Sequence, residues 1–344
     1  TGGRRPQMYS LKSDVMYIVA VSMDQLVTRV AILDMQNNFA FPIENFELTL
    51  ANNPKSLNQL LDLLKKYIQK SGIVKNKIVG IGIGMPGFVD IKKSINNTYL
   101  KPARGNVVSE LESELGVPVF IDNDSSLVAL AELKFGKALN RKNSMVINIG
   151  WGVGLGMILN GELFRGNNGF AGEFSHIPIF TNNKICGCGK SGCLETETSL
   201  LVIIDKAIKG IKEGKSTSLK DISMDHPEAA AHSIIEAALH GDSFSIDLIT
   251  EVGYNIGRGV AILIHILNPE LIVLSGRGSL AGRLWRAPIQ QAINKLCIPK
   301  IAEDTTIEIS QMNYQAEIIG TACLVMDQID KRKFLLTHEK SLIS

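Results

Sequence analysis

The chain has 344 residues, of which 45% are hydrophobic and 20% are charged, and its formal net charge is +2 at pH 7. This composition excludes extended disorder and leaves room for two domains with cores of their own. The small net charge excludes a nucleic-acid surface spread over the whole body. No apolar run reaches the length of a membrane span, and residues 1–6 are polar and basic, unlike a signal peptide. We therefore predict a cytoplasmic protein that makes no membrane contact.

The first part of the chain alternates strand and helix patterns. Residues 16–22 and 27–34 are apolar strands joined by the short polar step Met23-Asp24-Gln25, which predicts a hairpin. The spacing of apolar residues then predicts further helices at 55–69, 106–115 and 125–135, and buried strands at 78–83 and 117–121. This alternation predicts an α/β fold.

The second part begins with another hairpin, at residues 144–148 and 153–159, around the glycine-rich segment 150–156. A long amphipathic helix at 244–267 and a buried strand at 271–274 follow, and a packed helix at 316–330 is expected to return to the first half. Two hairpins, each followed by α/β units, indicate a duplicated architecture with a ligand cleft between its halves. The predicted organisation is a basic arm at 1–10, an N-terminal lobe at 11–122 joined by helix 316–330, a larger lobe at 123–315 and a tail at 331–344.

Three cysteines and a histidine lie close together in the larger lobe. Thiolate and imidazole are preferred ligands of Zn²⁺, and nearby glycines allow the tight turns that bring closely spaced sulfurs to one ion. Disulfides or unused thiols are the alternatives, but a C-x-C spacing strains a bridge, and the two other cysteines, Cys297 and Cys323, lie in apolar stretches that suggest packing. We predict a structural zinc site formed by His176, Cys186, Cys188 and Cys193.

Several segments in this order resemble the ROK family of repressors and sugar kinases, and the resemblance covers the chain from Tyr17 onward. The segments are Asn123-Asp124 after a strand, 171–176 (AGEFSH), 186–195 (CGCGKSGCLE), and 267–270 (LNPE) running into 272–276 (IVLSG). The resemblance implies the duplicated fold of actin-like and hexokinase-like (ribonuclease H-like) ATPases, with a sugar held between two α/β lobes. It also implies an assembly of two or four copies.

The resemblance further implies a sugar site, in which Asp124 corresponds to the catalytic base of the kinases. Carboxylates and amides suit this role because they accept and donate hydrogen bonds to hydroxyl groups. On spacing alone Asp124 fits a helix N-cap equally well, and the two acids beside the cysteines could be solvent-exposed charges. One nitrogen of the histidine could bind zinc while the other contacts a sugar or a carboxylate. The implied sugar-binding residues are Asn123, Asp124, Glu173, His176 and Glu195.

The first hairpin departs from the kinase pattern. Kinases of the family have a turn of the form D-x-G-G-T that approaches ATP and Mg²⁺, and this chain has residues 22–26 (SMDQL) there. Without glycine the backbone cannot come close to the phosphates, and Ser22 offers no carboxylate for the metal. Trp151 stands where kinases commonly have threonine, and Gly276-Arg277 replaces a glycine pair. We therefore expect ATP and Mg²⁺ binding to be lost, and segment 150–156 alone is weak evidence for a nucleotide.

The basic arm resembles the junction that joins a winged helix-turn-helix domain to the sugar-binding body of the family's repressors, although on composition alone it is a flexible tail. No helix-turn-helix pattern occurs in these residues, so operator DNA would be contacted only through a domain missing from this chain. The favoured interpretation is the sugar-sensing, oligomerising body of a repressor of carbohydrate genes, with a sugar, a sugar phosphate or a protein as effector. The alternative is an ATP-dependent kinase of glucose, mannose or an N-acetylhexosamine that uses Asp124 as its base. A third possibility is a scaffold that keeps the fold and the zinc but binds no sugar.

Overall fold

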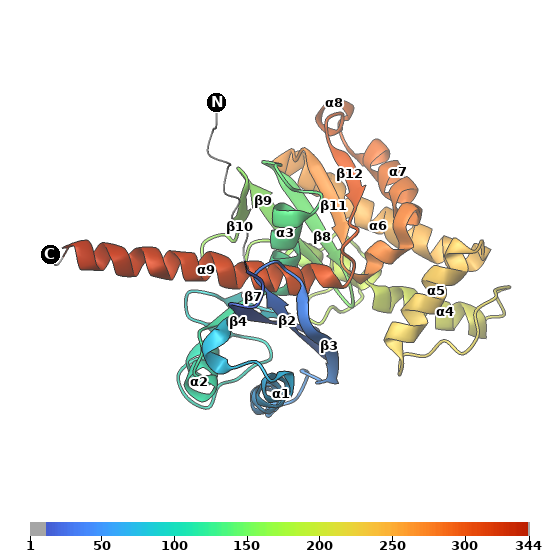
Figure 1. The fold of residues 1–344 in the computed structure, drawn as a ribbon. Coiled ribbons are helices and arrows are strands. Elements are labelled where there is room, and N and C mark those ends of the chain that lie inside the picture. Colours follow the sequence, from blue (N-terminus) through green and yellow to red (C-terminus); the bar gives the residue numbers. More distant parts are fainter. Residues whose placement is uncertain (1–11, 343–344) are drawn as a thin grey trace, which may run out of the picture. The chain divides into compact units, whose positions relative to one another are not determined.

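A computed structural model describes residues 12–342, which fall into two compact units. Unit 1 comprises the described residues up to Asp122 and those from Thr321 onward, and unit 2 comprises Asn123–Gly320. The predicted basic arm, residues 1–10, lies outside the described residues. Each unit is built around its own five-stranded sheet (Figure 1).

The sheet of unit 1 has the strand order β3-β2-β1-β4-β7. Strand β1 pairs antiparallel with β2, which confirms the first hairpin, and parallel with β4. Strands β1 and β4 are buried along nearly their whole length, as expected where a sheet is covered on both faces. The strands are β1 (Tyr17–Met23), β2 (Val27–Asp34), β3 (Phe39–Glu47), β4 (Ile78–Met85) and β7 (Val119–Asn123), with a separate two-stranded pair β5 (Val89–Asp90) and β6 (Ile95–Asn96).

Helices cover both faces of this sheet (Figure 1). Helices α1 (Ser56–Ser71) and α2 (Val107–Leu115) bury leucines and Tyr67 in one core with the strands, and the short helix η1 (Lys75–Lys77) precedes β4. On the other face α9 (Gln315–Leu342) packs directly on β4, because a Cβ at Gly82 would lie only 2.5 Å from the carbonyl oxygen of Thr321. Glycine in the strand thus permits close approach of the helix backbone.

The sheet of unit 2 repeats this arrangement, with the order β10-β9-β8-β11-β12. Strand β8 pairs antiparallel with β9 and parallel with β11, and β11 pairs parallel with β12. The same sequence of antiparallel and parallel neighbours around the first strand of each unit confirms the predicted duplication. The strands are β8 (Ser144–Ile149), β9 (Val153–Leu159), β10 (Glu162–Phe164), β11 (Leu271–Ser275) and β12 (Thr306–Ile309).

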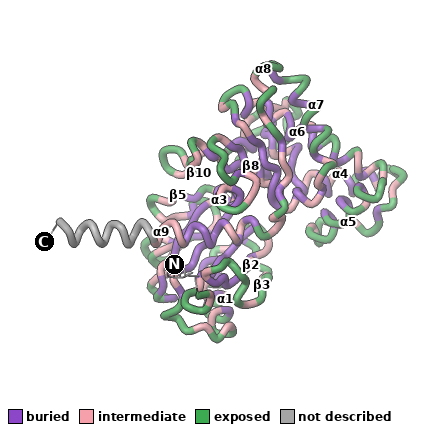
Figure 2. The backbone as a smooth tube through the Cα atoms, turned by 45° about the horizontal axis from the view of Figure 1, so that its top comes forward, coloured by how far each residue is buried: buried purple, intermediate pink, exposed green. Residues whose placement is uncertain are grey.

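Alternate side chains of this second sheet enter two different cores. Met145, Ile147 and Ile149 of β8 pack with α6 (Ser243–Leu267), whereas Val146 packs with α3 (Asp124–Phe135). The buried stretches of the chain accordingly follow the strands and α6 (Figure 2). The remaining elements of unit 2 are α4 (Leu200–Lys212), α5 (Pro227–Leu239), α7 (Arg286–Leu296), α8 (Pro299–Ala302), η2 (Phe174–His176), η3 (Leu194–Glu197) and η4 (Arg277–Trp285).

The structure corrects two of the elements that were assigned from the sequence. The C-terminal helix does not stop at residue 330 but extends to Leu342, and the N-cap of α3 is Asn123 rather than Asp124. Asn123 has extended backbone angles and its side chain accepts hydrogen bonds from the first turn, so Asp124 is already helical. Among residues 12–342, no helix is both long and apolar enough to cross a lipid bilayer.

Candidate functional site

The predicted metal ligands lie at the two ends of one small β-ribbon, residues 178–193. His176 ends η2, and Cys193 immediately precedes η3 and forms a bridge with Pro178 at the base of the ribbon. A second bridge joins Ile185 to Ser191 near the tip, where Cys186 and Cys188 lie. The chain therefore folds back so that residues far apart along the ribbon meet.

The geometry of these four side chains fits a tetrahedral metal site. Their ligand atoms all lie within 4.8 Å of one another, with Cys186 Sγ 3.5 Å from His176 Nδ1 and Cys188 Sγ 3.7 Å from Cys193 Sγ. Metal bonds of about 2.3 Å to sulfur and about 2.0 Å to nitrogen place two sulfurs about 3.8 Å apart and sulfur and nitrogen about 3.5 Å apart. These two separations agree with the expected values, and all five cysteines are free thiols.

The surroundings of the thiols also favour a cation. Burial raises the pKa of Cys186 and of Cys193, and the Glu195 carboxylate raises both further, whereas a backbone N–H at Lys190 lowers the pKa of Cys188. A buried thiolate next to a carboxylate needs a nearby positive charge. A divalent metal ion held by the four side chains would supply it.

Glu173 and Glu195, the two acids beside the cysteines, both lie close to the predicted metal ligands. His176 presents Nδ1 to Cys186 and Nε2 to Glu173, whose Oε2 lies 3.6 Å away. Glu195 Oε1 lies 3.9 Å from Cys186 Sγ. Partial burial raises the pKa of Glu173, the Glu195 carboxylate adds to this, and His176 opposes it. Glu173 and His176 are 39% and 26% exposed, so a ligand in solvent can reach both.

The other two predicted sugar ligands lie at the start of α3. Asn123 Oδ1 accepts hydrogen bonds from the backbone N–H groups of Ser125 and Ser126, and Asp124 Oδ1 accepts one from Ser125 at 2.7 Å. These bonds fix both side chains at the carboxyl end of β7, where ligands bind in α/β sheets.

The glycine-rich turn between β8 and β9 lies against both the start of α3 and Glu195. A Cβ at Gly154 would lie 1.9 Å from Ser125 Oγ, and one at Gly152 would lie 2.7 Å from Glu195 Oε2. A Cβ at Gly156 would meet Ala129 at 2.2 Å. These glycines are therefore explained by close packing, without a nucleotide.

Helix α6 supports the base of the ribbon. A Cβ at Gly259 would meet Leu194 and Phe174 within 2.8 Å. The helix therefore lies directly against Leu194, which follows Cys193, and Phe174, two residues before His176. Arg258 precedes Gly259 on the same helix. Its Nη2 donates a hydrogen bond to the carbonyl of Ile179 at 3.1 Å, and its guanidinium lies 4.4 Å from the Phe180 ring centre.

The β1–β2 turn has a feature that sequence reasoning missed. Asp24 Oδ1 accepts hydrogen bonds from the backbone N–H groups of Leu26 and Val27, both at 2.8 Å, and its Oδ2 lies 3.2 Å from Arg29 Nη1. The carbonyls of Gln25 and Leu26 accept from residues 50 and 48. The sequence shows an acid in this turn but not the direction in which its carboxylate points.

Trp151 and Arg277, the two residues of unit 2 that depart from the kinase pattern, contact each other. The Arg277 guanidinium lies 4.9 Å from the Trp151 ring centre and 5.4 Å from that of Tyr314, and Arg277 Nε is 3.2 Å from Glu228 Oε2. Trp151 is 6% exposed and the Arg277 side chain 11%. Sequence reasoning identified both positions, but not their stacking.

A further acid, Glu197, was also missed. Its buried carboxylate pairs with two lysines and an asparagine, and these partners are spread from residue 182 to residue 206. No local pattern in the sequence joins them.

The chain belongs to the ROK family, whose model matches residues 43–328. The fold class is therefore the predicted one, the duplicated α/β architecture of actin-like and hexokinase-like proteins.

Individual relatives include both of the family's functional groups. The chain is similar to a glucokinase of Halalkalibacterium halodurans, with 33% identity over 78% of this chain and 82% of the enzyme. It is also similar to a xylose repressor of Caldicellulosiruptor bescii, with 30% identity over 95% of this chain and 82% of the repressor. The crystal structure of a ROK family transcriptional regulator, a homologue of the E. coli MLC protein, has 25% identity and a TM-score of 0.78, over 92% of this chain and 78% of the regulator.

Proposed function

We propose that this chain is the sugar-sensing and oligomerisation body of a ROK-type transcriptional repressor that controls carbohydrate uptake or catabolism. A zinc ion would be held by His176, Cys186, Cys188 and Cys193. Because four protein ligands close the coordination shell, the ion would fix the ribbon rather than activate water. The sugar would be bound by Asn123, Asp124, Glu173, His176 and Glu195.

The observation that carries the proposal is the closed β1–β2 turn. A turn that binds phosphate offers free backbone N–H groups to the anion. Here the Asp24 carboxylate accepts two of them and is itself paired with Arg29, and Asp24 is only 8% exposed. The turn thus contains its own anion, and a triphosphate brought to it would meet a like charge.

Two further observations support the sensor. The stacked Trp151 and Arg277 fill space in unit 2 that the kinase pattern leaves to small residues. The match to the xylose repressor covers 95% of this chain, compared with 78% for the glucokinase. A dimer or tetramer, with operator DNA contacted by a separate N-terminal domain, completes the proposal.

The alternative is an ATP-dependent sugar kinase. It is favoured by the glucokinase relative and by the position of Asp124, whose carboxylate is held at the end of β7 where a catalytic base could receive a hydroxyl proton.

A binding and turnover experiment separates the two candidates. Xylose, glucose, mannose, N-acetylglucosamine and N-acetylmannosamine are titrated by calorimetry, and each is then incubated with ATP and Mg²⁺ in a coupled assay. The sensor predicts that one sugar binds and none is phosphorylated. Turnover of any of them at a rate above that of Asp124→Asn supports the kinase, and failure of every sugar to bind contradicts a sugar sensor.

A further inference from the structure

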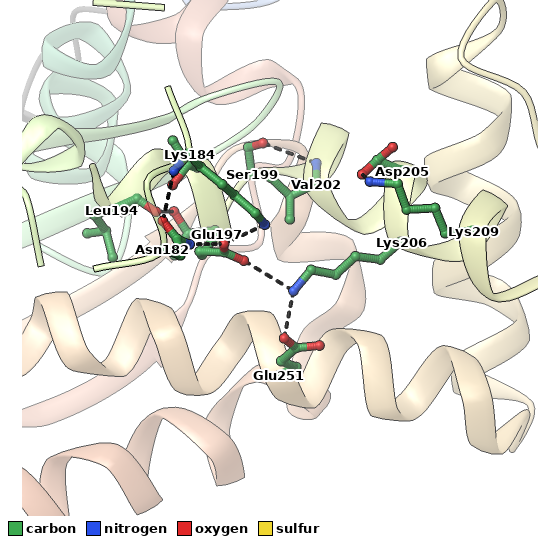
Figure 3. Close-up of polar contacts among 12 residues, drawn as sticks. Asn182, Lys184, Leu194, Glu197, Ser199, Val202, Asp205, Lys206, Lys209 and Glu251 are labelled. Atoms are coloured by element: carbon green, nitrogen blue, oxygen red, sulfur yellow. Dashed lines mark hydrogen bonds and ion pairs between the residues drawn. The ribbon is translucent and has the colours of Figure 1, made fainter. Parts of the chain in front are cut away.

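Glu197 is a buried acid outside the predicted metal and sugar ligands, and its carboxylate lies among side chains of the ribbon and of α4. It ends η3, four residues after Cys193, and its side chain is 9% exposed. Oε1 accepts from Asn182 Nδ2 at 2.6 Å and lies 2.5 Å from Lys184 Nζ (Figure 3). Oε2 lies 3.3 Å from Lys206 Nζ.

These partners come from different elements. Asn182 and Lys184 belong to the ribbon, whereas Lys206 lies on α4 and also pairs with Glu251 of α6 at 2.6 Å (Figure 3). Burial by itself would raise the pKa of Glu197, but the two ammonium groups outweigh it and hold the pKa below its usual value. The carboxylate is therefore charged, and it ties the ribbon to two helices.

The contacts of Glu197 with Asn182 and Lys184 lie on the ribbon close to the metal ligands at its tip. His176 and Cys193 lie at the base, where Leu194 N–H donates to the carbonyl of Ile177 at 3.0 Å. Lys184 comes two residues before Cys186, in the arm of the ribbon that leads to the tip. A metal site tolerates only a few tenths of an ångström in its ligand distances, so the tip must be held against the base.

We infer that Glu197 is a positioning residue for the metal site: by holding Asn182 and Lys184 against α4, it keeps Cys186 and Cys188 within bonding distance of the ion that His176 and Cys193 bind. This inference rests on the proposed zinc site. Removing outer groups that orient metal ligands typically lowers metal affinity by about 10- to 100-fold.

The chain offers a matched control on the same helix. Asp205 and Lys209 of α4 form an ion pair at 2.6 Å, but their side chains are 48% and 66% exposed and contact no part of the ribbon in Figure 3. The variant Asp205→Asn removes one negative charge, as Glu197→Gln does, and breaks only this exposed ion pair.

The test compares Glu197→Gln, Glu197→Asp and Asp205→Asn. Zinc release to the chromophoric chelator 4-(2-pyridylazo)resorcinol is followed at a temperature where circular dichroism shows each variant folded. We expect Glu197→Gln to release zinc at least about tenfold faster than the wild type, Glu197→Asp to restore part of the difference, and Asp205→Asn to match the wild type. Cobalt-substituted protein adds a readout that a loss of stability alone does not move, because the visible absorption reports ligand geometry. Its bands should shift or weaken in Glu197→Gln.

Equal release rates and equal cobalt spectra for Glu197→Gln and the wild type would overturn the inference. If Glu197→Gln does not fold, the double variant Asn182→Ala/Lys184→Gln takes its place, since it removes both ribbon contacts of Glu197 and leaves the Lys206 pair intact. Wild-type release in that variant would overturn the inference equally. A wild-type chain that binds no zinc would instead refute the proposed metal site, and the role of Glu197 with it.

Discussion

Replacing Gly152 by alanine should weaken sugar binding without unfolding the protein. A Cβ at this position would lie 2.7 Å from Glu195 Oε2, and the backbone of Gly152 does not have a positive φ. Alanine is therefore compatible with the turn, and the atom it meets is the end of a flexible side chain. The Glu195 carboxylate must move away from the new methyl group, and this movement is expected to disturb sugar binding.

The size of the effect follows from this distance. Ordinary contact begins near 3.4 Å, so Oε2 has to retreat by about 0.7 Å. If Glu195 accepts a hydrogen bond from a sugar hydroxyl, most of a charge-assisted bond worth about 1.5–3 kcal/mol is lost. This corresponds to a Kd about 10- to 100-fold higher.

Calorimetric titration of the sugar found in the screen measures this change, and thermal unfolding checks the fold. Gly150→Ala is the control, because a Cβ there would have only an ordinary contact, 3.8 Å from the carbonyl oxygen of Gly152. Equal sugar affinity in the two variants would refute the placement of Glu195 in the sugar site.

Other changes test the metal group, a helix cap and the packing of α9. Cys188→Ser should reduce bound zinc from one ion per chain to substoichiometric levels by elemental analysis; full zinc occupancy would contradict the Cys3His site. Asp242 caps α6 by accepting from Ser245 N–H; burial by itself would raise its pKa, but this bond and those from Thr217 and Ser218 together hold the pKa well below its usual value. Its charge thus stabilises the fold above about pH 5 and loses this contribution as the pH falls below about 4, so the stability difference between wild type and Asp242→Asn, measured by urea unfolding, should shrink toward pH 2. A difference that grows on acidification would refute that assignment. Gly82→Ala should cost about 1–3 kcal/mol in the same assay, because its Cβ would meet the Thr321 carbonyl, and an unchanged midpoint would contradict the packing of α9 on β4.

The sequence predicted most of the fold because its signals are local. The apolar runs at Tyr17–Met23 and Leu271–Ser275 and the spacing of α6 are strong patterns, and each was found within one or two residues. Short or exposed elements gave no such signal. Strand β3 is mostly exposed and β10 has only three residues, and neither was assigned.

The candidate site divides in the same way. Ligand chemistry and spacing identified His176 and the cysteines, which the fold brings within 4.8 Å of one another. The partners of Glu197 and the inward turn of Asp24 depend on side chains that meet only after folding. The capping role of Asn123 was assigned to its neighbour, because both residue types suit an N-cap and only the backbone angles distinguish them.

The most direct test of the sensor is whether the β1–β2 turn accepts a nucleotide. Binding of a non-hydrolysable ATP analogue with Mg²⁺ is measured by calorimetry on the wild type in the presence of its sugar. We predict that the sugar binds and that the analogue gives no binding heat up to millimolar concentration. Saturable binding of the analogue, abolished by enlarging the turn with Gln25→Trp, would contradict a turn closed by Asp24 and would favour the kinase.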